Sequence, residues 1–303
     1  KYMDIYVAEF DKNGDPTNVA TIDKDGIVNT SESEGTVCFD KKFKTMYFTR
    51  CPNKDNLTLG CDIWKVSIVE GQFVDPVKLK LKHDEKISVG HPCLTTDGMK
   101  LIFASDMKSS GGDASFGGRD LWYVSYNKKA KTWDSIPRNM GSSFNTSGNE
   151  LFPSIGKGGE FFFASDGLKG IGGLDIFICK PLEEKNTWGA AQNMGYPINS
   201  PSNDYAITSH GNKGYFTSER RLSNDEYASD LWSYSIPPNL YDVKVIVHEF
   251  GNKNKRIADA QVSFSGDDES EWADNTNDNG TTIKFDVKNG KQRYINEDVT
   301  YSI

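Results

Sequence analysis

A short motif recurs five times along this chain of 303 residues, and it limits the possible folds more than any other feature of the sequence. In each copy an aspartate is followed by isoleucine or leucine and then by an aromatic residue. Neighbouring copies lie 55 to 58 residues apart, and they begin at Asp4, Asp62, Asp120, Asp175 and Asp230. Self-similarity at a long fixed period is typical of repeat architectures, in which each repeat is one supersecondary unit.

Three further elements keep their place within the repeat. An apolar run precedes each of the last four motifs, at residues 46–49, 101–106, 161–166 and 215–219. A further element lies about a dozen residues before each run, and two repeats end on a polar strand with Asn-Met-Gly, at 139–141 and 193–195. Each unit therefore holds about four short strands, which is the content of one β-propeller blade. A single β-sandwich would not repeat its sequence in this way.

The rest of the sequence agrees with an all-β fold. Apolar runs of four to six residues alternate with clusters of Gly, Asn, Asp and Ser, and no long run has the helical spacing of apolar residues. Five motifs predict five blades of four strands, closed into a ring that protects the sheet edges. Only four apolar runs occur, so the first blade is expected to be incomplete within these residues. The predicted propeller covers residues 1–238.

A second domain is expected at residues 239–303. Pro237 and Pro238 stiffen the link and end strand pairing. Strands are then predicted over residues 241–247, 255–264 and 282–287, with a turn at 276–280 before the third strand. The spacing predicts a small, possibly truncated β-sandwich.

Both parts resemble known families. The sequence Phe-Ala-Ser-Asp…Gly-Gly-Leu-Asp-Ile-Phe at residues 163–177 resembles the TolB-like, WD-type propeller repeat. Residues 257–260 and 279–280 resemble the carboxypeptidase regulatory-like domain, a transthyretin-type β-sandwich. The two domains in this order resemble a Bacteroidota family of outer-membrane-associated proteins that carry an OmpA-type peptidoglycan-binding domain and include a type IX secretion system component.

This resemblance implies a function. The chain is expected to be a non-catalytic periplasmic scaffold, associated with the outer membrane, that binds protein partners among the outer-membrane secretion components. Peptidoglycan would be bound by a domain outside these residues. The alternative that stays open is a ligand- or glycan-binding propeller, with a glycoside hydrolase as its weaker form.

The charged and titratable residues exclude some functions and leave one catalytic alternative. The formal net charge is −8 and no dense cluster of Lys and Arg occurs, which argues against nucleic acid as a partner. No histidine pair has metal-ligand spacing and no nucleophile–base motif is present, so no metal, cofactor or catalytic residue is predicted. Glu34, Glu150 and Asp204 fall at the start of the expected innermost strands, where a propeller glycosidase could hold paired carboxylates. Because they recur in successive blades, we interpret them as structural and predict that the chain is not an enzyme.

Two of the five cysteines lie on the two legs of one hairpin. Cys51 follows the apolar run and Cys61 precedes the aspartate of the next motif, so a disulfide across this loop is predicted if the protein is exported. Cys38 and Cys93 share one position in adjacent blades, which is typical of small buried side chains.

Departures from the repeat give the predicted binding site. The loops at 107–116 and 220–227 differ from their counterparts, and loops on a rigid scaffold often carry binding residues. The alternative that stays open is that both are ordinary surface loops without a binding role. Aromatic residues and arginine usually supply most of the binding energy of an interface. The predicted partner-binding residues are Phe116, Arg220, Arg221 and Tyr227.

Overall fold

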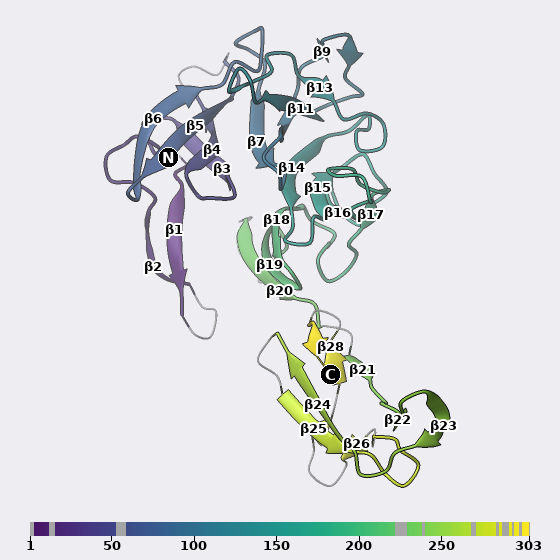
Figure 1. Cartoon of the computed structure of the whole chain (residues 1–303). Coiled ribbons are helices and arrows are strands. Elements are labelled where there is room, and N and C mark those ends of the chain that lie inside the picture. Colours follow the sequence, from purple (N-terminus) through teal and green to yellow (C-terminus); the bar gives the residue numbers. More distant parts are fainter. Residues whose placement is uncertain are drawn as a thin grey trace. The chain divides into compact units, whose positions relative to one another are not determined.

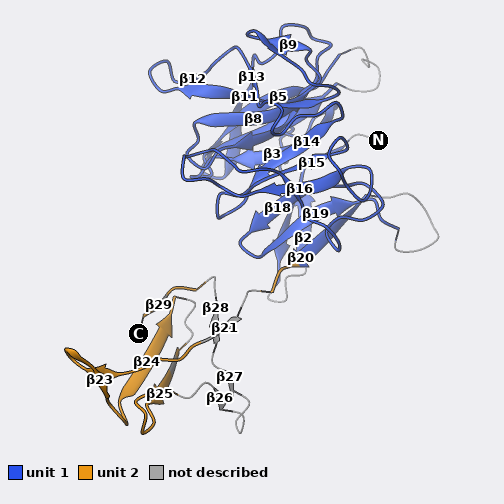
Figure 2. Ribbon diagram, turned by 90° about the vertical axis from the view of Figure 1, so that its right-hand side faces the viewer, with its two compact units in different colours: residues 1–234 blue, residues 235–303 orange. Residues whose placement is uncertain are grey.

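The computed structural model is all-β and divides into two compact units, residues 1–234 and 235–303 (Figure 2). It describes residues 3–11, 16–52, 59–221, 229–237, 240–267, 271–282, 285–286, 291–292, 294–296 and 299–302. Within these ranges no helix is long and apolar enough to cross a membrane. The first unit ends a few residues before the boundary that was predicted at residue 238.

In its described part, unit 1 contains the β1–β2 hairpin, four sheets that follow the sequence repeat and a short hairpin within one loop (Figure 1). The hairpin is β1 (Tyr6–Phe10) and β2 (Pro16–Thr21). The first sheet is β3 (Ser33–Phe39), β4 (Thr45–Cys51), β5 (Asp62–Val69) and β6 (Gln72–Lys78). The second is β7 (Val89–Leu94), β8 (Lys100–Ser105), β11 (Asp120–Asn127), β12 (Thr132–Trp133) and β13 (Arg138–Asn139). The third is β14 (Glu150–Ile155), β15 (Phe161–Ser165), β16 (Asp175–Cys179) and β17 (Gln192–Asn193). The fourth is β18 (Asp204–His210), β19 (Lys213–Ser218) and β20 (Asp230–Ser235).

The motif aspartates occupy equivalent places, which confirms a β-propeller fold. Asp62, Asp120 and Asp175 each begin the third strand of a sheet and pair with the end of the second strand, opposite Arg50, Ser105 and Ser165. The first strands β3, β7, β14 and β18 are neighbours in that order, so they form the inner side of the arrangement. Among the described residues, four sheets have inner strands and the first repeat supplies only β1 and β2, so five complete blades stay a prediction.

The motif aspartate holds the turn before it and the strand after it. The Asp120 carboxylate accepts hydrogen bonds from the Phe116 amide at 2.7 Å and from Asn139 Nδ2 at 2.8 Å. Asp175 accepts equivalent bonds from the Ile171 and Gly172 amides and from Asn193 Nδ2. A short acceptor side chain at a strand end satisfies turn amides in this way, which explains why the aspartate and the asparagine of Asn-Met-Gly recur together.

A second recurring asparagine joins each sheet to the segment that leads into the next one. Asn145 accepts from the Leu121 amide at 2.8 Å and donates to the Leu121 carbonyl at 3.0 Å. Asn199 makes the same pair of bonds with Ile176, and Asn29 makes them with Ile5. The third pair shows that β1 is the counterpart of β11 and β16, that is, the third strand of its blade.

The apolar side chains of the repeat fill the space between neighbouring sheets. One cluster joins Ile63 and Tyr47 of the first sheet to Val89 and Phe103 of the second. The next two clusters join the second sheet to the third and the third to the fourth, through residues such as Leu121 with Leu151 and Ile176 with Ile207. Each sheet therefore buries its faces only by packing on its neighbours, as expected of blades.

Unit 2 is built of short strands, shown at the yellow end of the chain in Figure 1. They are β21 (Leu240–Asp242), β22 (His248–Glu249), β23 (Asn252–Arg256), β24 (Gln261–Gly266), β25 (Glu271–Asn275), β26 (Phe285–Asp286), β27 (Lys291–Gln292), β28 (Tyr294–Asn296) and β29 (Tyr301–Ser302). β24 pairs with both β25 and β29 and buries Val262 and Phe264 on one face. The strand predicted over 255–264 is interrupted because Asp259 adopts a left-handed conformation with φ 53°. The sandwich architecture stays a prediction.

Two further short strands interrupt the loop between β8 and β11. They are β9 (Ser109–Ser110) and β10 (Asp113–Ala114), and they pair with each other as a hairpin. This hairpin lies at the end of the propeller where the second strand of each sheet leads into the third, and it is the expanded loop that the sequence singled out.

Candidate functional site: the loop end and the axis of the propeller

Three buried carboxylates mark the loop end of the inner strands. Glu34, Glu150 and Asp204 stand at or next to the first residue of β3, β14 and β18, and each is fully buried. Glu34 pairs with Arg50 at 2.8 Å and Asp204 pairs with Arg220 at 2.8 Å. All three were predicted to be structural, and these contacts hold the ends of the blades together.

Glu150 differs from these two because no arginine of the described ranges pairs with it. Its carboxylate accepts bonds from Thr146 Oγ1 at 2.6 Å, the Thr146 amide at 2.9 Å and Ser165 Oγ at 2.8 Å. Burial, opposed by these hydrogen bonds, raises the pKa of the Glu150 carboxyl above its usual value. Loss of solvation therefore outweighs the hydrogen bonds at this position.

Arg220 packs largely into its blade, with 17% of its side chain exposed, and its role in partner binding stays a prediction. Its guanidinium lies 4.9 Å from the Trp232 ring centroid and donates to the carbonyls of Pro197 and Ile198. Arg50 repeats the arrangement over Trp64 at 4.5 Å, with bonds to the backbone of residues 27 and 28. In the sequence Arg220 stands in a loop that departs from the repeat. Its ion-pair partner Asp204 lies 16 residues earlier, so the loop by itself gives no sign of this contact.

The other three predicted partner-binding residues differ in their position and exposure. The Phe116 ring is 47% exposed on the loop after β10. Arg221 is exposed as well, directly after the partly buried Arg220. Tyr227 lies outside the described residues. Phe116 thus lies between β10 and β11 of the second sheet, whereas Arg220 and Arg221 follow β19 of the fourth sheet.

The expanded loop is fixed by specific contacts. Arg138 Nε donates to Asp113 Oδ2 at 2.7 Å, and the Asn139 amide donates to the same oxygen at 3.2 Å. Gly111 turns the hairpin with φ 57°, and a Cβ there would meet Ile136 Cγ2 at 2.5 Å, so only glycine fits. The loop is thereby held in one shape beside Ile136.

A cleft of about 490 Å³ lies against this loop. It is lined by the β9–β10 hairpin, by Leu81, Lys82, His83 and Met107, and by residues 135–137. Ile136 on its wall is more than half exposed. An ordered loop with exposed apolar side chains beside a cleft is suited to binding another molecule.

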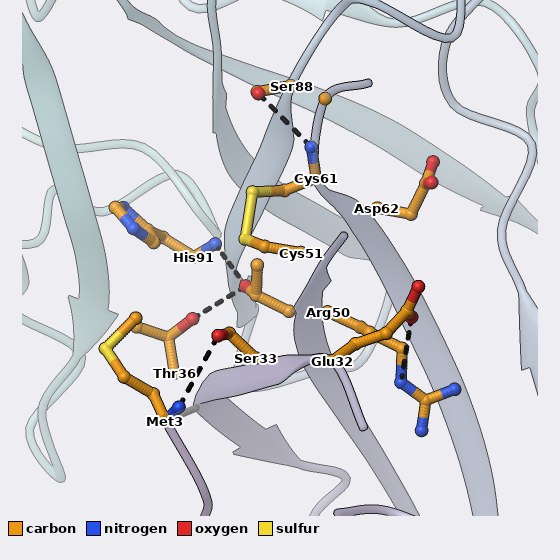
Figure 3. The surroundings of a disulfide bond; sticks show 12 residues. Met3, Glu32, Ser33, Thr36, Arg50, Cys51, Cys61, Asp62, Ser88 and His91 are labelled. Carbon is orange, nitrogen blue, oxygen red and sulfur yellow. Dashed lines mark hydrogen bonds and ion pairs between the residues drawn. A yellow bond between two sulfur atoms is a disulfide. The ribbon is translucent and has the colours of Figure 1, made fainter. Parts of the chain in front are cut away.

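Cys51 and Cys61 form a disulfide that closes the corresponding loop of the first sheet (Figure 3). The Cys61 amide donates to Ser88 Oγ, so the bridge also lies against the next blade. Cys38, Cys93 and Cys179 are free thiols. Burial raises the pKa of all three, to about 12 for Cys38 and Cys179, which leaves the thiols protonated and unreactive at neutral pH.

The axis of the propeller is where the blades differ. Each inner strand has a bulge with one residue in a left-handed conformation, and these residues are Thr36, His91, Phe152 and Ala206. All four line one cavity of about 210 Å³. The equivalent positions thus carry a hydroxyl, an imidazole, a phenyl ring and a methyl group, an asymmetry that the sequence motifs did not predict.

Three rings are stacked beside this cavity. His91 lies 3.9 Å from Phe152, and Phe152 lies 4.8 Å from Tyr205, measured between ring centroids. The Phe152 amide donates to His91 Nδ1 at 3.2 Å, which places the imidazole proton on Nε2. Burial and the Arg119 charge lower the pKa of His91 to about 4, so the imidazole is neutral at physiological pH.

A second cleft, of about 520 Å³, lies at the opposite end of the first two sheets. Tyr47, Tyr126 and Trp133 form its aromatic wall, with Tyr126 and Trp133 in an edge-to-face contact at 5.2 Å. The remaining lining includes four lysines, Lys41, Lys42, Lys65 and Lys185, against two carboxylates, Asp40 and Asp97. This combination of aromatic rings and positive charge suits a ligand with an apolar face and an anionic group.

No protein-family model and no curated protein matches the sequence of this chain. Solved structures of similar fold include the B. megaterium levansucrase, at a TM-score of 0.43 and 11% identity, covering 77% of this chain and 75% of that one. A Mycobacterium tuberculosis puromycin-hydrolyzing peptidase is similar at a TM-score of 0.41 and 10% identity, covering 78% of this chain and 35% of that one. A thermostable family-43 glycoside hydrolase is similar at 0.39 and 10%, covering 68% and 70%. The chain thus spans about a third of the length of the peptidase, and these likenesses concern the fold alone.

One prediction is corrected by these comparisons. We predicted that the chain is not an enzyme, and the solved structures of similar fold are peptidases and glycoside hydrolases, so that exclusion was wrong. Blades that repeat their carboxylates need not repeat the residues at their centre. The four different residues at the axial bulges show that a repeated scaffold can enclose an asymmetric centre.

Proposed function

We propose that this chain is a protein-binding scaffold of the bacterial cell envelope that contacts its partner through the loop end of the propeller. The observation that carries this proposal is the β9–β10 hairpin, an insertion into the repeat that is held in one shape and stands beside a cleft with Ile136 and Phe116 exposed. A preformed loop binds at a lower entropic cost than one that must be ordered on binding.

The disulfide supports a location outside the reducing cytoplasm. Disulfides between structural cysteines persist in oxidising compartments such as the bacterial periplasm and are rare in the cytosol. Cys51 and Cys61 are paired, while the three free cysteines keep high-pKa thiols. The proposed location is the periplasm, in association with the outer membrane.

The sequence motifs support a more specific role. The TolB-like repeat followed by a regulatory-like domain resembles the outer-membrane-associated family described above, which leads us to propose a place in an assembly of the type IX secretion kind. Its partners would be outer-membrane secretion components, and peptidoglycan would be held by a domain outside these residues.

The test is co-purification of partners with the full-length protein from its native envelope. Phe116→Ala and Ile136→Ala remove exposed side chains beside the cleft, and we expect each to reduce the recovered partner at least several-fold, as hot-spot truncations do. Leu182→Ala is the matched control, because Leu182 is equally exposed in the loop between β16 and β17 at the opposite end. Unchanged recovery with both loop variants, or an equal loss with Leu182→Ala, would contradict the proposal.

A second candidate function rests on the lysine-rich aromatic cleft. Trp133 and Tyr126 could stack on the apolar face of a sugar ring while the lysines bind its acidic groups. Titration with acidic and neutral oligosaccharides, followed by tryptophan fluorescence, tests it. Binding of the acidic series that is lost in Trp133→Ala would favour the ligand-binding function over the scaffold.

A further inference from the structure

Two side chains near the axis of the propeller carry hydrogen-bond donors that no described residue accepts. The Arg119 guanidinium forms no ion pair or hydrogen bond among the described residues, although the Arg119 backbone is fixed by the Asn149 side chain and the Glu150 amide. The His91 imidazole accepts at Nδ1 from the Phe152 amide, so its proton lies on Nε2, where no described residue accepts it. Both donors are therefore free for a ligand that brings an acceptor.

The two donors line the same small cavity, of about 90 Å³. The Cys51–Cys61 disulfide forms another part of its wall, and Figure 3 shows His91 beside this disulfide. Every lining residue belongs to the first three sheets or to their loops, so the cavity does not depend on β1 or on the last sheet. Arg119 is the only charged residue in the lining, which makes this cavity attractive to an anion although the whole chain is acidic.

The axial cavity of about 210 Å³ adjoins this site, because His91 lines both. No charged residue lines the axial cavity. An apolar cavity of about 150 Å³ is large enough to hold benzene, so this one has room for a single ring. His91 and Tyr205 cover the two faces of the Phe152 ring. A bound ring would therefore meet the edge of Phe152, in the edge-to-face geometry that aromatic pairs favour.

We propose that the axis of the propeller binds a small aromatic carboxylate, with the carboxylate at Arg119 and the ring in the axial cavity. A guanidinium binds a carboxylate through two parallel hydrogen bonds, and His91 Nε2 adds a third donor. One unpaired cation matches the single negative charge of a carboxylate. The site is separate from the β9–β10 hairpin, so the proposal does not rest on the scaffold function.

Benzoate and its neutral analogue benzamide are the probes, titrated into the 303-residue chain by isothermal calorimetry. We expect benzoate to bind more tightly than benzamide. Arg119→Gln should weaken benzoate by about tenfold or more, as expected for the loss of a charged hydrogen-bond partner, and should leave benzamide unchanged. Arg119 is exposed, so this variant should keep the urea midpoint of the parent. The matched control is Lys169→Gln, which removes an exposed positive charge between β15 and β16 and should not change the binding of benzoate.

The position of the ring has its own test. Phe152→Leu should weaken benzoate and benzamide alike, because it removes the ring edge that both would contact. Nuclear Overhauser contacts between benzoate protons and the Phe152 ring in the parent give the same information without a substitution. Equal benzoate affinity in the parent and Arg119→Gln would overturn the proposal, as would an equal loss in Lys169→Gln. Competition by inorganic phosphate, together with no contact between benzoate and Phe152, would reduce the site to one for simple anions and also overturn it.

Discussion

Replacing Arg220 by alanine is the most informative perturbation of this fold. The Arg220 side chain is 17% exposed and its ion-pair partner Asp204 is fully buried. In the variant the Asp204 carboxylate keeps its bonds from the Ser200 amide and hydroxyl but loses its only cation among the described residues. Breaking a buried ion pair on one side costs about 3–5 kcal/mol, because the remaining charge stays buried without compensation.

Two further losses act in the same direction. The contact with the Trp232 ring contributes about 0.5–2 kcal/mol, and the carbonyls of Pro197 and Ile198 lose their donor. These contacts are coupled, so we do not add them to the ion-pair cost. We expect Arg220→Ala to lower the free energy of unfolding by about 3–5 kcal/mol in total, measured by urea denaturation at neutral pH with tryptophan fluorescence.

Arg138→Ala is the matched control, since Arg138 also pairs with an aspartate at 2.7 Å but its side chain is 55% exposed. An exposed pair of this kind contributes only about 0.2–1 kcal/mol. If the two variants lose the same stability, or if Arg220→Ala loses less than about 1 kcal/mol, the placement of Arg220 in the core is refuted.

Three other predictions test the buried groups. Because burial raises the pKa of the Glu150 carboxyl in the folded state, its ionisation lowers the free energy of unfolding as the pH rises through that pKa. Glu150→Gln should therefore be at least as stable as the parent at pH 7, and the difference between their urea midpoints should shrink towards pH 4. The pKa of His91 in the folded state is lowered to about 4, so the parent should lose stability as the pH falls from about 6.5 towards 4, and His91→Gln should not show this loss. A His91 imidazole that titrates near 6.5 by NMR would contradict its burial in the ring stack. Replacing Cys51 and Cys61 by serine should lower the free energy of unfolding by about 2–3 kcal/mol at most, because the closed loop is short; reductant should reproduce the loss in the parent and leave the variant unchanged.

The sequence motifs predicted the strands of unit 1 and their equivalence because those features are local and repeated. The aspartate, the apolar run and the Asn-Met-Gly segment each fix one hydrogen-bonded turn or one strand, so their spacing is retained in the fold. The linking asparagines could also have been found. Asn29, Asn145 and Asn199 follow the second residue of their motifs by 24, 24 and 23 residues, and this regular spacing is visible in the sequence.

The sites were less predictable because they depend on segments that are distant in sequence. The sequence by itself determined an all-β repeat, since a period of four short strands per unit can bury its faces only by stacking sheet on sheet. Only the tertiary structure decided that Arg220 points inward, because Asp204, Trp232 and two carbonyls surround it from three other segments. It also decided that the axis is asymmetric, because the bulges of four inner strands bring unlike residues to one cavity. Side chains at equivalent places in a repeat share their backbone environment, but what they meet depends on the neighbouring blade.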